Sequence, residues 1–142
     1  MIIVSACLLG IKCKYDGSDN LIPDLMNSKN KYEMIPVCPE QLGGLPTPRA
    51  PAEILNGKVY NKNGEDVTDN FRKGAEETLR IAAITGCKKA ILKDGSPSCG
   101  VHRIYNGQHE GVKIEGKGFT ASLLLKQGIT VYSEEEIKKA GI

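Results

Sequence analysis

Short apolar runs alternate along the chain with amphipathic segments, and this alternation is the main guide to the fold. Four apolar runs bounded by turn-forming residues predict strands over residues 2–6, 32–37, 89–93 and 129–132. Apolar side chains recur at helical spacing from Val67 to Ala82, while charged residues occupy the opposite face. This second pattern predicts an amphipathic helix.

The ends of the predicted helices carry signals of their own. Thr68 or Asp69 can cap the start of the amphipathic helix, and Gly86 can end it in a left-handed conformation. A more apolar helix is predicted over residues 119–127, and Gly128 ends it. A short strand follows each glycine, so the same order of helix, glycine and strand occurs twice.

The remaining segments are more irregular. Ser133 and Glu136 form a capping-box pattern that predicts a short final helix. Residues 21–28 predict another helix, although a proline and nearby asparagines weaken it. Residues 36–51 contain five of the seven prolines and predict a stiff loop. Two Asn-Gly pairs between short apolar pieces in residues 54–67 predict a β-hairpin.

Alternating helices and short apolar strands are typical of a parallel sheet that is covered on both faces. We therefore expect an α/β fold with three layers: a mostly parallel sheet, helices on both faces, and a β-hairpin insertion. The length of 142 residues fits one domain spanning residues 1–142.

The composition excludes several classes of function. The net charge is +2, the basic residues are scattered and there is no tryptophan, so there is no strong case for nucleic-acid binding. No stretch approaches the roughly 18 apolar residues of a membrane span. The first residues lack the pattern of a secretory signal, so we expect a cytoplasmic protein. In that reducing compartment its five cysteines are more often metal ligands or catalytic groups than disulfides.

Three of the cysteines share one sequence context. Cys7, Cys38 and Cys99 each follow a short apolar run and lie in a turn rich in glycine, proline or serine. Because the carboxyl ends of parallel strands open onto one crevice, we expect these thiols to share a site for a soft metal centre. Cys87 has no motif around it and is expected to pack in the core. Cys13 remains open as a fourth ligand, a neighbouring thiol or a loop residue.

The spacing of the cysteines indicates which kind of metal centre they could hold. The chain has neither the C-x2-C pattern of zinc sites nor a ferredoxin-type run. Three dispersed thiolates fit a cubane iron–sulfur cluster in which one iron has no protein ligand. Such an open-sided cluster is oxygen-labile, so an aerobically prepared sample can lack it. A structural zinc site or a cluster-binding module without catalysis stays open as the alternative. Thiol redox chemistry between Cys7 and Cys13 ranks last, because their spacing is not that of a redox motif.

Other polar residues in these turns are candidates for the chemistry. Glu40 follows Cys38 in a proline-flanked turn and is a candidate general base. Ser96 and Ser98 could donate hydrogen bonds to a ligand or could simply form the turn. Asp16 is a candidate substrate contact or a turn former. Four basic residues could hold a phosphate, and the one between two prolines is the best placed: Arg49, with Lys12, Lys14 and Arg103 as the others.

The segments around these residues resemble a known family. Ser5–Gly10 with Tyr15–Gly17, Pro36–Glu40 with Gly43–Leu45 and Pro48–Arg49, and Ser96–Gly100 are similar to the signature segments of a bacterial domain family that includes the thiouracil desulfurases. The resemblance covers nearly the whole chain and is to the short, single-domain form.

This resemblance implies a specific enzyme. It implies a [4Fe-4S] cluster ligated by three cysteines, which match Cys7, Cys38 and Cys99. It also implies non-redox removal of sulfur from thiolated uracil compounds, with thiouridine nucleotides as the expected small-molecule partners. A glutamate and a serine are essential in the family, and we place them at Glu40 and Ser96, with Ser98 as the alternative serine.

Overall fold

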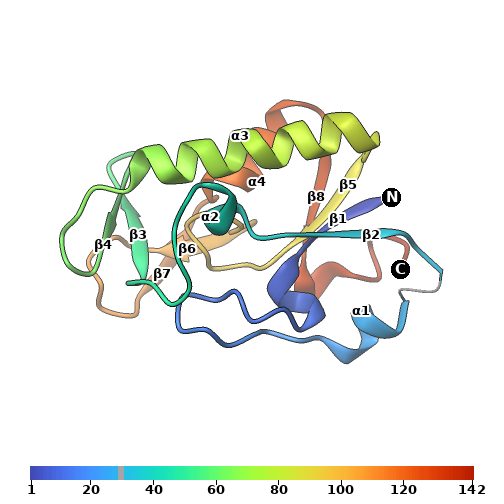
Figure 1. Ribbon diagram of the computed structural model, residues 1–142, viewed down its shortest axis with the longest axis horizontal. Helices are drawn as coiled ribbons and strands as arrows, with labels where there is room; N and C mark the ends of the chain where they lie inside the picture. Colours follow the sequence, from blue (N-terminus) through green and yellow to red (C-terminus); the bar gives the residue numbers. More distant parts are fainter. Residues whose placement is uncertain (29–30) are drawn as a thin grey trace.

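Four parallel strands form the central sheet of the computed structural model, which describes residues 1–28 and 31–142 (Figure 1). Their order in the sheet is β2-β1-β5-β8. The strands are β1 (Ile2–Ser5), β2 (Met34–Val37), β5 (Lys89–Leu92) and β8 (Thr130–Ser133). These bounds confirm the four strands predicted from the apolar runs, and each end differs from the prediction by no more than two residues.

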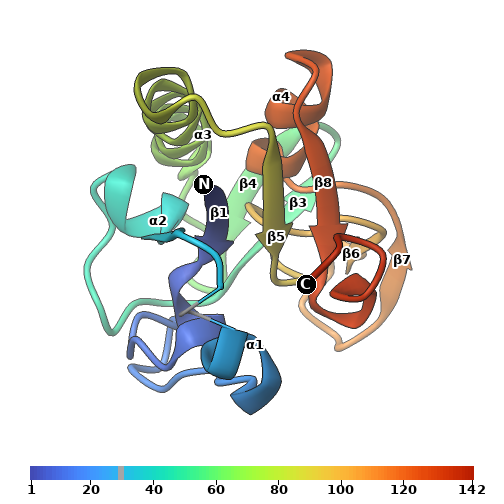
Figure 2. The ribbon, with the colours of Figure 1, turned by 90° about the vertical axis from the view of Figure 1, so that its right-hand side faces the viewer.

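Helices cover both faces of the sheet, so the three-layer prediction is confirmed. The long helix α3 (Thr68–Thr85) and α4 (Phe119–Lys126) pack on one face. The Phe71 and Phe119 rings pack edge to face there, with their centroids 6.4 Å apart. The 3-10 helix η1 (Ala6–Leu9) and α1 (Pro23–Asn27) lie on the other face (Figures 1 and 2). Strand β1 is buried on both sides, which explains its unbroken apolar run.

A short helix replaces part of the stiff loop predicted over residues 36–51. Helix α2 (Pro39–Leu42) begins with Pro39, a position where proline costs no hydrogen bond. It lies on α3 almost backbone to backbone, because a Cβ added to Gly43 would come within 2.0 Å of the Asn70 carbonyl oxygen. A Cβ on Gly74 would likewise meet the Pro39 carbonyl oxygen at 2.0 Å. These two glycines therefore fix α2 against the long helix.

Two hairpins lie beyond the carboxyl ends of the central strands (Figure 1). The predicted one consists of β3 (Ala52–Leu55) and β4 (Lys58–Asn61), and its Asn56-Gly57 turn has positive φ at both residues, 52° and 78°. The sequence analysis did not predict the second, which pairs β6 (Arg103–Tyr105) with β7 (Lys113–Glu115).

The start of α3 differs from the prediction. Neither Thr68 nor Asp69 caps the helix, because Thr68 is already its first residue and its hydroxyl accepts the Val59 N–H at 2.9 Å. The side chain of Asp66 instead accepts the Thr68 N–H at 2.9 Å. The tertiary contact with β4 thus takes the hydroxyl that the sequence assigned to the cap.

The remaining helix ends agree with the sequence more closely. Gly86 ends α3 with a φ of 71°, as predicted. Ser133 and Glu136 form the predicted capping box, but it begins a single 3-10 turn, η3 (Glu134–Glu136), and not a longer helix. None of the helices in the described part of the chain is long and apolar enough to span a membrane.

Candidate active site

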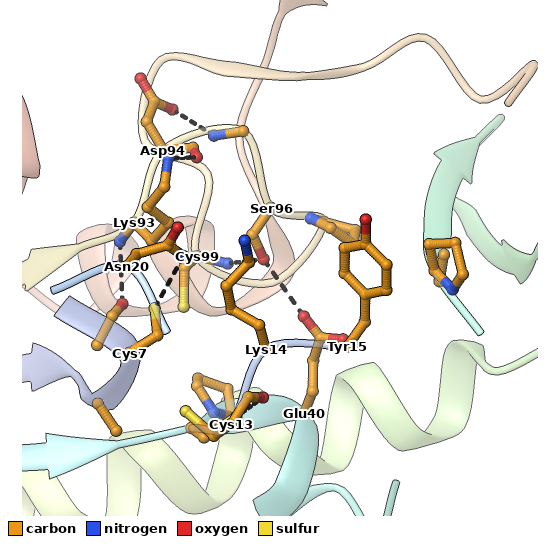
Figure 3. A pocket seen from close by; sticks show the side chains of 18 of the residues that line it. Cys7, Cys13, Lys14, Tyr15, Asn20, Glu40, Lys93, Asp94, Ser96 and Cys99 are labelled. Carbon is orange, nitrogen blue, oxygen red and sulfur yellow. Dashed lines mark hydrogen bonds between the residues drawn. The ribbon is translucent and has the colours of Figure 1, made fainter. Parts of the chain in front are cut away.

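The turns that follow β1, β2 and β5 converge on one cavity of about 450 Å³. Cys7, Cys38 and Cys99 all line it, although 61 residues separate the last two in the sequence. Figure 3 labels Cys7 and Cys99 among the side chains of the cavity. They share this cavity because β2, β1 and β5 are neighbours in the sheet and run in the same direction, so their carboxyl ends open at one edge.

Each cysteine is held by a different local structure. Cys7 lies in η1 immediately after β1, and the Asn20 side-chain amide donates to its Sγ at 3.4 Å. Cys38 directly precedes α2 and is half-buried. Cys99 is buried in a tight turn that the Gly100 N–H closes by donating to the Ser96 carbonyl at 2.8 Å.

Two further polar side chains of the cavity form a pair. The Ser96 hydroxyl donates to Glu40 Oε2 at 3.4 Å, and Figure 3 shows the two side chains pointing toward each other. The same hydroxyl oxygen accepts the backbone N–H groups of Ser98 at 3.0 Å and Cys99 at 3.1 Å. Since both lone pairs of the oxygen are taken, its single proton is directed toward Glu40.

Arg49 anchors the other oxygen of this carboxylate. Its Nε donates to Glu40 Oε1 at 3.1 Å, and its side chain is only 6% exposed. Glu40 Oε2 is therefore the oxygen that remains available to a ligand in the cavity.

The thiols differ in their ease of ionisation. Burial raises the pKa of Cys7 and that of Cys99 above the ordinary thiol value. A hydrogen bond with Cys13 lowers the pKa of Cys38 to about 6 and raises that of Cys13. Buried thiolates at positions 7 and 99 thus need a strongly positive partner, which a bound metal centre supplies.

The spread of the donors fits a cluster better than a single ion. Among the His, Cys, Asp and Glu side chains of the described residues, no three are placed to hold one metal ion. A mononuclear zinc site therefore gains no support. The three thiols instead line a cavity with room for a polynuclear centre, and thiolate is the ligand that iron–sulfur clusters prefer.

Comparison with known proteins identifies a family over nearly the full length of the chain. A family model described as 2-thiouracil desulfurase matches residues 2–136. The chain belongs to the 2-thiouracil desulfurase family. This match confirms the family resemblance seen in the sequence and the prediction that the protein is a desulfurase-type enzyme.

Two similar proteins add to this picture. An uncharacterized protein of Bacillus subtilis (strain 168), YbbK, is 43% identical over 147 residues, covering 96% of this chain and 97% of the relative. A solved structure of the [4Fe-4S]-dependent thiouracil desulfidase TudS is 45% identical and superposes with a TM-score of 0.94, covering 99% of this chain and 94% of the other. The α/β fold class is confirmed by this match, and the neighbour depends on the cofactor that the sequence analysis expected here.

Four of the candidate residues do not line the cavity: Ser98, Asp16, Lys12 and Arg103. Ser98 is buried and shares a hydrogen bond of 2.8 Å with Thr120. Asp16 is exposed and accepts the Ser18 N–H at 3.0 Å, as a turn former does. The geometry supports neither a catalytic Ser98 nor a substrate contact by Asp16, and it leaves Ser96 as the serine of the cavity.

Sequence reasoning missed several residues that line the cavity. The largest group lies on segments whose position depends on tertiary contacts: Asn20, Glu53, Lys93, Tyr105 and Lys113. Lys113 and Tyr105 belong to the second hairpin, so they could not be placed without it. Cys13, left open by the sequence, also lines the cavity and is 2% exposed. Cys87 packs in the core below α3, as expected.

Proposed function

We propose that this protein removes sulfur from thiolated uracil compounds without net oxidation or reduction, using a [4Fe-4S] cluster ligated by Cys7, Cys38 and Cys99. One observation carries the proposal: three thiols from neighbouring parallel strands line the same cavity as a hydrogen-bonded glutamate and serine. All five cysteines are free, so Cys7, Cys38 and Cys99 are available as ligands.

The three cysteines leave one iron of such a cluster without a protein ligand. A cluster held by these cysteines would supply a soft Lewis acid, which would polarise the C=S bond of a thiolated uracil and take up its sulfur. The chain's own contribution is to aim a base and a hydrogen-bond donor at the same substrate. This is the role we give to Glu40 and Ser96.

The overall reaction consumes one water for each thiocarbonyl. Oxygen from water replaces sulfur on the ring carbon, and the sulfur leaves as hydrosulfide, so no external oxidant or reductant is needed. Glu40 takes the proton from the attacking water at Oε2, because Arg49 holds Oε1. Once Oε2 carries that proton, the Ser96 hydroxyl is released from its hydrogen bond to Glu40 and donates to the charge that develops on the ring.

A charged end of the substrate would meet two lysines. Lys14 and Lys113 line the cavity, and neither forms a salt bridge with the residues that the structure describes. Lys113 Nζ lies 5.5 Å from the centre of the Tyr105 ring, at the side of the cavity formed by the second hairpin. Lys93 is less free, because it pairs with Glu134 at 3.4 Å. We therefore favour a thiouridine monophosphate over the bare base.

The decisive experiment is anaerobic reconstitution with iron and sulfide, followed by incubation with 4-thiouridine monophosphate and with 2-thiouracil. We expect one hydrosulfide for each uracil product and a lower KM for the phosphorylated substrate. Cys7→Ser, Cys38→Ser and Cys99→Ser should each abolish iron binding. Cys87→Ser, which removes a thiol outside the cavity, should retain it. A protein that loads iron fully and releases no sulfide would be a cluster-binding module and would contradict the proposal.

A further inference from the structure

The Arg49 guanidinium joins helix α2 to two loops around the cavity. Nε donates to Glu40 Oε1 at 3.1 Å, which ties the arginine to α2. Nη1 donates to the Pro46 carbonyl at 3.2 Å and to the Thr47 hydroxyl at 2.9 Å, so its own proline-rich loop is held as well.

The second terminal nitrogen reaches the loop that follows η1. Nη2 donates to the Cys13 carbonyl at 2.8 Å and lies 4.0 Å from the Cys38 sulfur. The Arg49 backbone N–H adds a hydrogen bond of 2.7 Å to the Tyr15 carbonyl. Helix α2 with Cys38 and Glu40, and the loop that carries Cys13, are thus linked through one side chain.

This bonding pattern conflicts with the phosphate-binding role expected from the sequence. A guanidinium has five N–H groups, and all of those on Arg49 have partners within the chain. The side chain is also only 6% exposed. A phosphate could bind it only by breaking one of these contacts, whereas Lys14 and Lys113 are available in the same cavity.

We propose that Arg49 is a positioning residue that fixes the Glu40 carboxylate relative to Cys38, and that it is not a ligand of the substrate. The kinetic test of this inference rests on the proposed function, because it measures desulfuration. A positioning role accounts for the burial of Arg49 in its proline-rich loop. The planar guanidinium can hydrogen-bond to a carboxylate and to two loops at once, which the single ammonium group of a lysine cannot do.

The kinetic test compares Arg49→Lys with the wild-type holoenzyme. We expect kcat to fall about 10- to 100-fold on both 2-thiouracil and 4-thiouridine monophosphate, since small misplacements of catalytic groups cost about this much. The ratio of the two KM values should stay within about twofold of wild type. A KM that rises only for the phosphorylated substrate would make Arg49 a phosphate ligand and overturn the proposal.

A double-mutant cycle separates positioning from a general structural role. Because Arg49 acts through Glu40, the variant carrying both Arg49→Lys and Glu40→Gln should be no slower than Glu40→Gln alone. Losses that multiply would overturn the proposal. Arg72→Lys is the matched control, because Arg72 pairs with Asp69 at 2.7 Å on the surface, away from the cavity, and it should leave kcat unchanged.

The cluster-free protein gives a second, independent readout. Arg49→Lys and Glu40→Gln should each lower the urea midpoint of unfolding, and the double variant should unfold near the less stable single one. Additive shifts would mean that the two side chains do not act as a unit. If wild-type holoenzyme releases no sulfide, the proposed function fails, while this cycle still tests the contact itself.

Discussion

Replacing Glu40 by glutamine tests the chemistry with the smallest change in shape. The amide oxygen can take over the hydrogen bond from Arg49 Nε, now 3.1 Å from the carboxylate. The amide nitrogen then faces the Ser96 hydroxyl, at the position of Oε2. The variant keeps the volume of the side chain but cannot accept a proton from water.

The expected loss follows from the role of the carboxylate. General acid–base catalysis contributes about 10²- to 10⁴-fold, and we expect kcat to fall within this range. This corresponds to about 3–5 kcal/mol of lost transition-state stabilisation. The substitution also leaves the buried Arg49 without its counter-ion, so we expect a decrease of about 1–3 kcal/mol in the free energy of unfolding.

The assay measures hydrosulfide and uracil product under anaerobic conditions, with iron quantified in the same sample. Glu40 is not a cysteine and is not expected to bind iron, so iron content should match the wild type. Retention of kcat within about threefold, with the full iron content, would refute the assignment of Glu40 as the base. Loss of iron together with activity would instead place Glu40 in the binding of the cluster.

Three further changes probe other parts of the molecule. Cys13→Ala should keep iron content and retain sulfide release within about fivefold, because three cysteine ligands remain; loss of iron would make Cys13 a ligand. Gly74→Ala should lower the free energy of unfolding by more than about 2 kcal/mol, since the added Cβ would clash with the Pro39 carbonyl oxygen. An increase in the free energy of unfolding of up to about 1 kcal/mol would instead indicate an ordinary helix position. The pKa of Asp94 is lowered: burial alone would raise it, but the backbone N–H groups that donate to the carboxylate outweigh burial. Its stabilisation is therefore complete above about pH 4 and is lost as the pH falls; urea midpoints from pH 6 to pH 2 should fall more steeply for wild type than for Asp94→Asn.

The sequence alone was sufficient for the elements whose pattern is local. The apolar runs predicted all four strands of the sheet, and the helical periodicity after Val67 predicted α3. The first Asn-Gly pair predicted the turn at Asn56-Gly57 because that turn needs positive φ at both positions. The strand ends also placed Cys7, Cys38 and Cys99 at one edge of the sheet, where all three line one cavity, since the direction of parallel strands decides which turns share an edge.

Only the tertiary structure decided how side chains in the irregular segments are oriented. Ser96 and Ser98 flank one proline and look equivalent in the sequence, yet one faces Glu40 and the other Thr120. The partners of Arg49 come from loops up to 36 residues away along the chain. In turns without a repeating backbone geometry, no periodicity relates sequence position to direction, so packing between distant segments settles which polar atoms enter the cavity.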